Sequence, residues 1–301
     1  MKFVLSAEQR MFGETLREIL AESQTPKAIR AWAAGDTSPG RALWSAVAEA
    51  GLFAVAVPED SGGAGPLPVE LCVAAEELGR SAAPGPYVET LAATELLDGS
   101  RWLSRIAEGE AIVSLAVPHA LDADVADLVL TADGVEHRPG EPVTSLDPAR
   151  RLFRVPAATA PGFTDLGALL CAAQQIGVGR SLLDASVGYA KTRQQFGRPI
   201  GEYQAIKHHL ATAMVELEFA RPLVYGAALS YRTPDFARDV SAAKVAASEA
   251  SYGMAKTALQ VHGAIGYTDE YDPSLWIRKA RALYSAWGTP SEHRTRIMTA
   301  L

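Results

Sequence analysis

The sequence contains very little cysteine. Only Cys72 and Cys171 occur in 301 residues, far apart and each in an apolar stretch of helical character. Two distant cysteines cannot form the disulfide framework of a small secreted domain, and they do not have the spacing of a zinc site. We therefore expect reduced, buried thiols in a cytoplasmic protein, and no metal centre.

A concentrated basic surface is also missing. The chain has 28 Lys and Arg against 35 Asp and Glu, for a net charge of −7, and its basic residues form no stripe. Nucleic-acid binding depends on such a stripe, so we expect no nucleic-acid partner. A phosphorylated ligand is still compatible with this composition, because a few well-placed arginines are enough to bind it.

Long uninterrupted apolar runs are absent as well. The N-terminal stretch is already charged at Glu8 and Arg10, too early for the apolar region of a signal peptide. Other apolar runs are broken by charge before they reach the length needed to span a bilayer. The sequence therefore predicts neither secretion nor membrane insertion.

Helical periodicity dominates both ends of the chain. Residues 6–22 begin with a capping box formed by Ser6 and Gln9, followed by apolar residues at helical spacing. Long helices at the C-terminal end favour an antiparallel four-helix bundle. The other expected helices cover 41–51, 67–80, 86–108, 165–192, 203–231, 235–262 and 273–286.

Residues 111–158 have a different texture, with short β-branched runs separated by turn residues. The pair Asp133–Gly134 predicts a tight hairpin turn. We therefore predict a mainly α protein with three domains. These are an N-terminal helical domain (1–110), a shortened middle β domain (111–160) and a C-terminal four-helix bundle (161–301).

Two segments between the bundle helices carry more information than ordinary connectors. The first, "TRQQFGRPIGEYQ" (192–204), combines Arg193 with Phe196 and glycines, although a solvated helix C-cap would explain much of it. The second, 260–292, has a glutamine, a glycine loop and an acidic-aromatic turn. Glycine permits close backbone approach and arginine offers a fork for phosphate oxygens, so the pair suits a dinucleotide.

These segments resemble the acyl-CoA dehydrogenase family. Its pattern R-x-x-F-G-x-x-I-x-x-x-Q stands here as Arg193, Phe196, Gly197, Ile200 and Gln204, and its Q-x-x-G-G-x-G-Y-x-x-E-Y as Gln260, Gly263, Ala264, Gly266, Tyr267, Glu270 and Tyr271. The resemblance covers nearly the whole chain and implies FAD shared across a subunit interface. The contacts it implies are Arg193, Phe196, Gln204, Gln260, Val261, Gly263, Ala264 and Thr289.

The family's catalytic base has no counterpart in this sequence. Its reaction needs a carboxylate to remove the α-proton of an acyl-CoA, but the two positions where members place it fall on Trp287 and Gly167. Asp165 is two residues, or about 200° of helix, from Gly167, and we expect it to be a helix N-cap that faces away. Trp287 is interpreted either as a filler of acyl-chain space or as the wall of a bulky-substrate pocket.

The middle region also lacks the family's Thr-Glu-Pro loop and Trp-Ile-Thr/Ser strand, which contact the flavin ring. In this the chain is similar to the short, degenerate subunits of actinobacterial heteromeric acyl-CoA dehydrogenases of sterol and bile-acid catabolism. The resemblance implies a non-catalytic or FAD-completing subunit of a heterotetramer, paired with a full-length homologue, an acyl-CoA substrate and an electron-transferring flavoprotein. Two alternatives stay open: a self-sufficient flavoenzyme, as a dimer or tetramer, whose displaced base is Asp165, and a non-enzymatic structural or regulatory subunit.

Four further residues are expected to have no catalytic or metal-binding role. His208 and His209 lie in mid-helix without a third metal ligand, and His262 is placed in the glycine loop, packed beside an adenine at best. Arg278 is predicted to make an internal ion pair.

Overall fold

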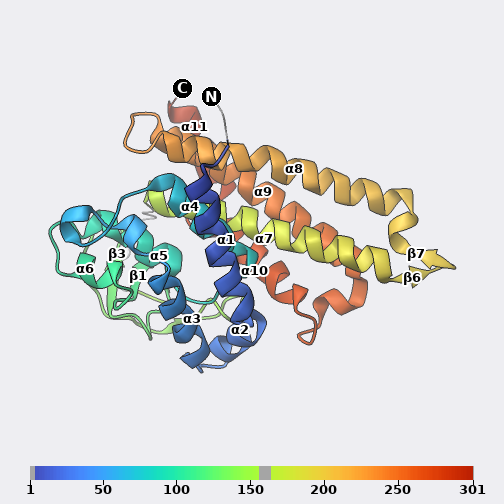
Figure 1. The fold of residues 1–301 in the computed structure, drawn as a ribbon, viewed down its shortest axis with the longest axis horizontal. Helices are drawn as coiled ribbons and strands as arrows, with labels where there is room; N and C mark the ends of the chain where they lie inside the picture. Colours follow the sequence, from blue (N-terminus) through green and yellow to red (C-terminus); the bar gives the residue numbers. More distant parts are fainter. Residues whose placement is uncertain (1–3, 156–163, 301) are drawn as a thin grey trace.

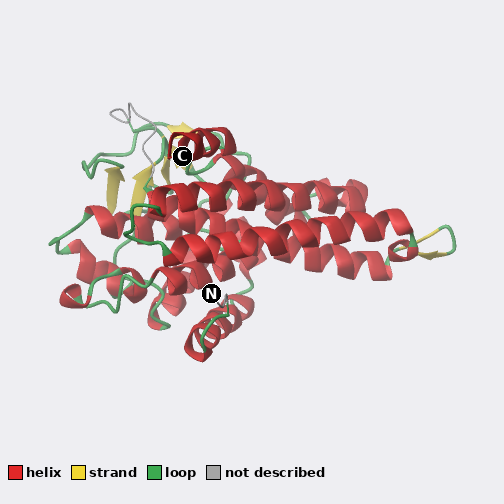
Figure 2. Cartoon of the chain, turned by 90° about the horizontal axis from the view of Figure 1, so that it is seen from above, coloured by secondary structure: helices red, strands yellow, loops and turns green. Residues whose placement is uncertain are grey.

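The computed structural model describes residues 4–155 and 164–300 of the chain. N-terminal helices and a small sheet lie at one side of the molecule, and a long helical bundle extends away from them (Figure 1). The cartoon seen from above shows the same separation, with the strands of the sheet at one end and a small hairpin at the far end of the bundle (Figure 2). This confirms the mainly α architecture that the sequence predicts.

The N-terminal helices are α1 (Ala7–Glu22), α2 (Thr25–Ala33), α3 (Ser38–Glu49) and α4 (Pro68–Arg80), with the short 3₁₀ turns η1 (Ala54–Ala56) and η2 (Glu59–Ser61) between α3 and α4. The capping box is confirmed, because the Gln9 amide donates to Ser6 Oγ at 3.2 Å and the Ser6 amide to Gln9 Oε1 at 2.9 Å. Sequence reasoning missed α2, a short helix that starts with a proline in its first turn and buries Ile29 and Trp32.

The prediction of one helix over 86–108 is wrong. The segment contains α5 (Tyr87–Ala93), the 3₁₀ turn η3 (Thr94–Leu96) and α6 (Trp102–Ala107). Gly99 lies between them with φ +65°, a left-handed conformation that ends a right-handed helix. Apolar spacing continues through this break, which is why the pattern alone suggests a single helix.

The sheet is small, as expected. Its strands are β1 (Val113–Ala116), β2 (Ala120–Leu121), β3 (Leu128–Thr131), β4 (Pro142–Val143) and β5 (Leu152–Phe153), in the order β3-β1-β2-β5-β4. β1 is parallel to β3 and antiparallel to β2. The Asp133–Gly134 turn is confirmed, with Gly134 at φ +80° and the Thr131 amide bonded to the Val135 carbonyl.

The bundle is built from α7 (Asp165–Thr192), α8 (Gln204–Leu229), α9 (Phe236–His262) and α10 (Pro273–Ser285). The α7–α8 connection holds the hairpin of β6 (Gln194–Gln195) and β7 (Arg198–Pro199) and the turn η4 (Ile200–Glu202), and η5 (Gly263–Tyr267) follows α9. The helix α11 (Pro290–Ala300) was not predicted.

The helix α7 forms the core of the molecule. It crosses α4 at two glycines: a Cβ on Gly177 would lie 1.9 Å from the Glu76 carbonyl oxygen, and one on Gly79 would lie 2.0 Å from that of Gln174. By length and composition α7 could cross a membrane, which corrects the expectation that charge breaks every long apolar run. However, 83% of its most apolar 18-residue stretch is buried inside the protein, as expected for a helix of the hydrophobic core.

The expectation of reduced, buried thiols is confirmed. Cys72 and Cys171 are both free and buried.

Candidate active site and cofactor-binding segments

The residues predicted to be functional lie at two opposite ends of the bundle. The helix α7 has 28 residues and is therefore about 40 Å long. Gly167 lies in its first turn, and Arg193 directly follows its last residue. We call these the proximal end and the distal end of the bundle.

The distal end collects most of the predicted cofactor contacts. The rings of Tyr189, near the end of α7, and His262, at the end of α9, are 4.6 Å apart, and His209 of α8 lines the same groove as Gln260 of α9. Three segments distant in sequence therefore meet here (Figure 1). Six of the predicted contacts are exposed at this end: Arg193, Phe196, Gln204, Gln260, Gly263 and Ala264.

The β6–β7 hairpin presents Phe196 to solvent. This side chain is 93% exposed and its backbone has φ +53°, next to Gly197 at φ +83°. A bulky residue with positive φ is uncommon, and exposure of its ring gives the isolated chain no compensating burial. The guanidinium of the neighbouring Arg193 makes no hydrogen bond or ion pair with any residue in the described part of the chain. Both side chains are therefore available to a ligand or a partner.

The η5 segment offers open backbone beside them. Gly263 has φ +64°, and a Cβ built on it would meet nothing within 4 Å. Glycine is suited to this position because of its backbone conformation, and the space in front of it is free. A phosphate group could approach the main chain closely at this point.

The two residues before Gly263 point inward instead. Val261 is buried, and His262 is the last residue of α9, which corrects its expected place in the loop. His262 donates from Nδ1 to the Ala258 carbonyl at 2.8 Å and packs against the rings of Tyr189 and Tyr271, and its burial lowers the pKa of the imidazole. These residues fix the shape of the distal end, and nothing in the structure assigns them a direct contact with a cofactor.

Thr289 is not part of this group. It lies at the proximal end, two residues after Trp287, and its hydroxyl and amide both bond Glu292 Oε2, at 2.8 and 2.6 Å. The Glu292 amide bonds back to Thr289 Oγ1 at 3.3 Å. In this conformation Thr289 caps the N-terminus of α11.

The two residues that the sequence predicts at the family's base positions are in direct contact at the proximal end. Trp287 is 2% exposed, and a Cβ added to Gly167 would lie 2.0 Å from Cζ3 of its ring. Trp287 has φ +59° and its carbonyl accepts a hydrogen bond from His293 Nε2 at 2.9 Å. A left-handed backbone at a tryptophan costs about 1–3 kcal/mol and requires support from its surroundings. The indole thus occupies the space beside Gly167, and neither position offers a carboxylate.

Asp165 faces another way and is not the cap of α7. The cap is Thr164, whose hydroxyl accepts from the Gly167 amide at 3.0 Å, so the prediction for Asp165 was off by one residue. The Asp165 carboxylate pairs with Arg296 of α11 at 2.8 Å. This ion pair gives Asp165 a structural role between two helices.

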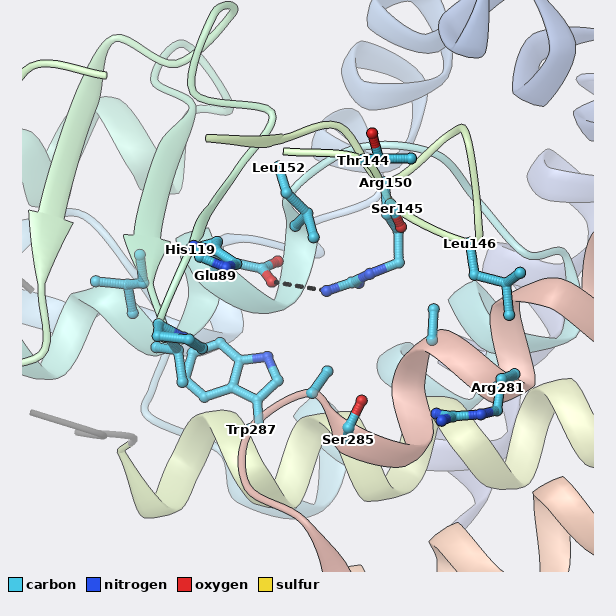
Figure 3. A pocket seen from close by; sticks show the side chains of 15 residues that line it. Glu89, His119, Thr144, Ser145, Leu146, Arg150, Leu152, Arg281, Ser285 and Trp287 are labelled. Atoms are coloured by element: carbon cyan, nitrogen blue, oxygen red, sulfur yellow. Dashed lines mark ion pairs between the residues drawn. The ribbon is translucent and has the colours of Figure 1, made fainter. Parts of the chain in front are cut away.

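A cleft that sequence reasoning did not find lies beside Trp287. It has a volume of about 330 Å³ and is lined by α5, the β1–β2 turn, the 144–152 segment and the end of α10. Glu89 and Arg150 face each other inside it, with Trp287 below them (Figure 3). Glu89 is buried, and burial raises the pKa of its carboxyl group. In the sequence, Glu89 stands out only as an acidic residue in a mostly apolar helix, α5, and belongs to no motif.

The remaining expectations concern histidines and one ion pair. His208 and His209 are exposed, and no group of three or more His, Cys, Asp or Glu within 4–155 and 164–300 could hold a metal ion. Arg278 pairs with Asp269 at 2.8 Å, which confirms the predicted internal ion pair.

Comparison with known proteins identifies the family. Residues 6–110 match the family model for the acyl-CoA dehydrogenase N-terminal domain, and residues 158–301 match the model for the C-terminal domain. Acyl-CoA dehydrogenase IpdE2 of Mycobacterium tuberculosis is 35% identical over 309 residues, covering 96% of each chain, and IpdE2 of Mycolicibacterium smegmatis is 34% identical over 310 residues, covering 97% of this chain and 98% of its own. The chain belongs to the acyl-CoA dehydrogenase family.

Solved structures support the fold. Butyryl-CoA dehydrogenase from Megasphaera elsdenii superimposes with a TM-score of 0.82 at 21% identity, covering 100% of this chain and 99% of its own. The ChsE4-ChsE5 complex from Mycobacterium tuberculosis gives a TM-score of 0.82 at 22% identity, and the match covers 99% of this chain and 98% of the matched chain. The acyl-CoA dehydrogenase fold therefore extends over the whole of this chain.

The family implies FAD, and the distal end fits part of it. A free guanidinium at Arg193, exposed amides at Gln204 and Gln260, and open backbone at Gly263 are donors suited to phosphate and ribose oxygens. The proximal cleft is different, because the sequence around it lacks the family's two flavin-ring segments. The chain thus offers a fitting surface for one half of the cofactor.

Proposed function

We propose that this chain is the FAD-completing subunit of a heteromeric acyl-CoA dehydrogenase in the cytoplasm. One observation carries the proposal: Trp287 packs against Gly167, the two positions at which the sequence predicts the family's base, whereas Arg193 at the other end of α7 is exposed and unpaired among the described residues. Bound FAD would accept the hydride in the α,β-desaturation of an acyl-CoA. The base would come from a full-length partner, and an electron-transferring flavoprotein would reoxidise the flavin.

Residues 193–204 and 260–264 would hold the pyrophosphate and ribose half of FAD seated mainly in the partner. Arg193 would pair with a phosphate oxygen, and Phe196 would be covered by the partner or the cofactor. The sequence of the shortened middle domain, 111–160, lacks the family's segments that contact the flavin ring. This agrees with the proposal that the partner holds the flavin ring and this chain the pyrophosphate and ribose half. Val261 would support the site from inside, and Thr289 would act only if its capping bonds open.

An exposed apolar stripe on α8 supports assembly with another chain. Met214, Val215, Phe219 and Leu223 are 45% to 75% exposed and follow one another at helical spacing. A contiguous apolar patch on a soluble protein commonly marks an interaction surface. The stripe lies on the same helix that Gln204 begins, so one partner could cover both.

Two structural neighbours support a heteromer, because each pairs two different proteins. These are the ChsE4-ChsE5 complex and the Tcur3481-Tcur3483 steroid acyl-CoA dehydrogenase, the latter with a TM-score of 0.81 at 23% identity. We propose by this likeness that the substrate is the CoA thioester of a steroid or its degradation product.

The test is the FAD content of the complex purified with its full-length partner. We expect Arg193→Ala to lower bound FAD at least tenfold, since it removes a charge-assisted contact to phosphate. Arg232→Ala is the matched control, because Arg232 is an exposed arginine at the opposite end of α8 that stacks on Tyr231. Equal FAD content in both variants, with the complex intact, would refute the proposal and favour a purely structural subunit.

A further inference from the structure

The cleft at the proximal end contains an ion pair that completing a partner's FAD site does not require. Glu89 Oε1 and Arg150 Nη2 are 3.9 Å apart, too far for a hydrogen bond. The side chains are 5% and 12% exposed, respectively. A buried ion pair with such loose geometry recovers little of its desolvation cost. Within residues 4–155 and 164–300, the guanidinium of Arg150 therefore has donors without a hydrogen-bond partner, and it points into the cleft (Figure 3).

The other charges around Glu89 do not balance this arginine. Lys279 of α10 is bound to Asp147 at 3.0 Å, and His119 of the β1–β2 turn and Arg281 of α10 line the cleft wall. From α7, Cys171 interacts electrostatically with both Glu89 and Arg150, and its thiol is kept neutral because burial raises its pKa. Cations thus outnumber the single carboxylate in the cleft, which favours an anionic ligand.

The rest of the wall is suited to an apolar body. Leu115, Leu146 and Leu152 line the cleft together with the ring of Trp287. A second cavity, also about 330 Å³, shares Leu146 and Arg281 with the first. Its remaining lining is mostly apolar: Tyr252, Ala255, Leu259, Gly266, Tyr267 and Ile277, with Lys256, Ser274 and Arg278. The first cavity thus supplies most of the polar groups and the second most of the apolar surface, and apolar cavities of this size with a few polar groups are typical of small-molecule binding.

We propose that these two neighbouring cavities bind a compact apolar carboxylic acid, with its carboxylate on Arg150 and its body against Trp287 and Leu146. The incoming carboxylate takes the place of Glu89 as the partner of Arg150, and Glu89 takes up a proton. Burial already raises the pKa of this carboxyl group, so protonation is the less costly way to accommodate two acids beside one arginine. The site goes beyond completion of the FAD site and does not depend on it.

The experiment is isothermal titration of the full chain, or of its complex with the partner, with adamantane-1-carboxylate and no added flavin. Titration at pH 7 in two buffers of different ionisation enthalpy reports proton uptake. We expect the acid to bind with proton uptake, and adamantane-1-carboxamide to bind at least tenfold more weakly. The CoA thioester of the same acid, which has no free carboxylate, should also bind at least tenfold more weakly.

Three variants locate the site. Arg150→Gln should weaken binding of the acid at least tenfold, Arg150→Lys should retain part of it, and Glu89→Gln should bind the acid without proton uptake. Circular dichroism and urea unfolding confirm that each variant is folded. The proposal is refuted if the acid does not bind the folded chain, if acid and amide bind equally, or if only the thioester binds. Because no flavin is present, such a failure leaves the FAD proposal untouched.

Discussion

The ring of Trp287 rests on Gly167, leaving no room for a side chain at that position. A Cβ on Gly167 would come within 2.0 Å of the Trp287 ring, closer than any normal contact. Trp287 in turn is fixed through its backbone carbonyl, which accepts from His293 Nε2. Trp287 and Gly167, predicted from the sequence to stand at the family's base positions, thus form a packed pair.

Gly167→Ala should therefore lower the free energy of unfolding by about 1–3 kcal/mol, the usual cost of overpacking. Gly188→Ala in the same helix is the matched control, because nothing lies within 4 Å of a Cβ there. It should leave stability unchanged or raise it by up to about 1 kcal/mol. Urea unfolding measures both, and the packed-pair interpretation is wrong if they behave alike.

The same pair predicts a coupling between its members. Combining Gly167→Ala with Trp287→Leu should cost less than the sum of the two single changes, since the smaller side chain makes room for the methyl group. Additive costs in this double-mutant cycle would show that the two residues do not constrain each other.

His293 predicts a loss of stability in acid. Burial lowers its pKa from 6.5 to about 4, so the unfolded chain binds a proton there more readily than the folded one. Its contribution is fully present above pH 6.5 and is lost as the pH falls towards 4. Unfolding of His293→Gln should show a weaker pH dependence over that window, whereas His209→Gln, at an exposed histidine, should match the wild type.

For Asp122 we expect the opposite dependence, a contribution to stability that falls as the pH rises. Its carboxylate accepts from Trp32 Nε1 at 2.9 Å and pairs with Arg151 at 3.2 Å, yet burial raises its pKa to about 7. Its contribution is fully present below pH 3.8 and is lost as the pH rises through about 7, on the order of a few kcal/mol. The stability difference between wild type and Asp122→Asn should therefore change across this range.

Asp124→Asn is the control for that series. Asp124 pairs with the same Arg151, at 2.8 Å, but its side chain is 38% exposed. We expect its stability difference from wild type to be nearly constant between pH 4 and 7. A similar slope in both variants would show that burial of Asp122 does not cause the effect.

The long elements of the fold could be predicted because their signals are local. Apolar spacing and a capping box define α1, and the same spacing defines α7, α8 and α9. The break at Gly99 could not be found this way, since apolar residues continue on both sides of it. The helix α2 has nine residues, too few to show a clear helical repeat, and α11 buries a proline and a histidine, Pro290 and His293, in place of an apolar stripe.

The candidate site was predictable only where its residues form a motif. Arg193 and Gln260 are 67 residues apart, but each lies in a recognisable segment, and the contact of Tyr189 with His262 brings the ends of α7 and α9 together. Glu89 and Arg150 belong to no such pattern, and their contact depends on how α5, the sheet and α10 pack. The capping role of Thr289 likewise depends on a helix, α11, that sequence reasoning missed.

The most direct test of the account is the absorption spectrum of the purified chain, alone and with its full-length partner. The account predicts a colourless chain alone, and a yellow complex containing fewer flavins than polypeptide chains. A yellow chain that purifies by itself with one FAD per chain and oxidises an acyl-CoA would contradict it.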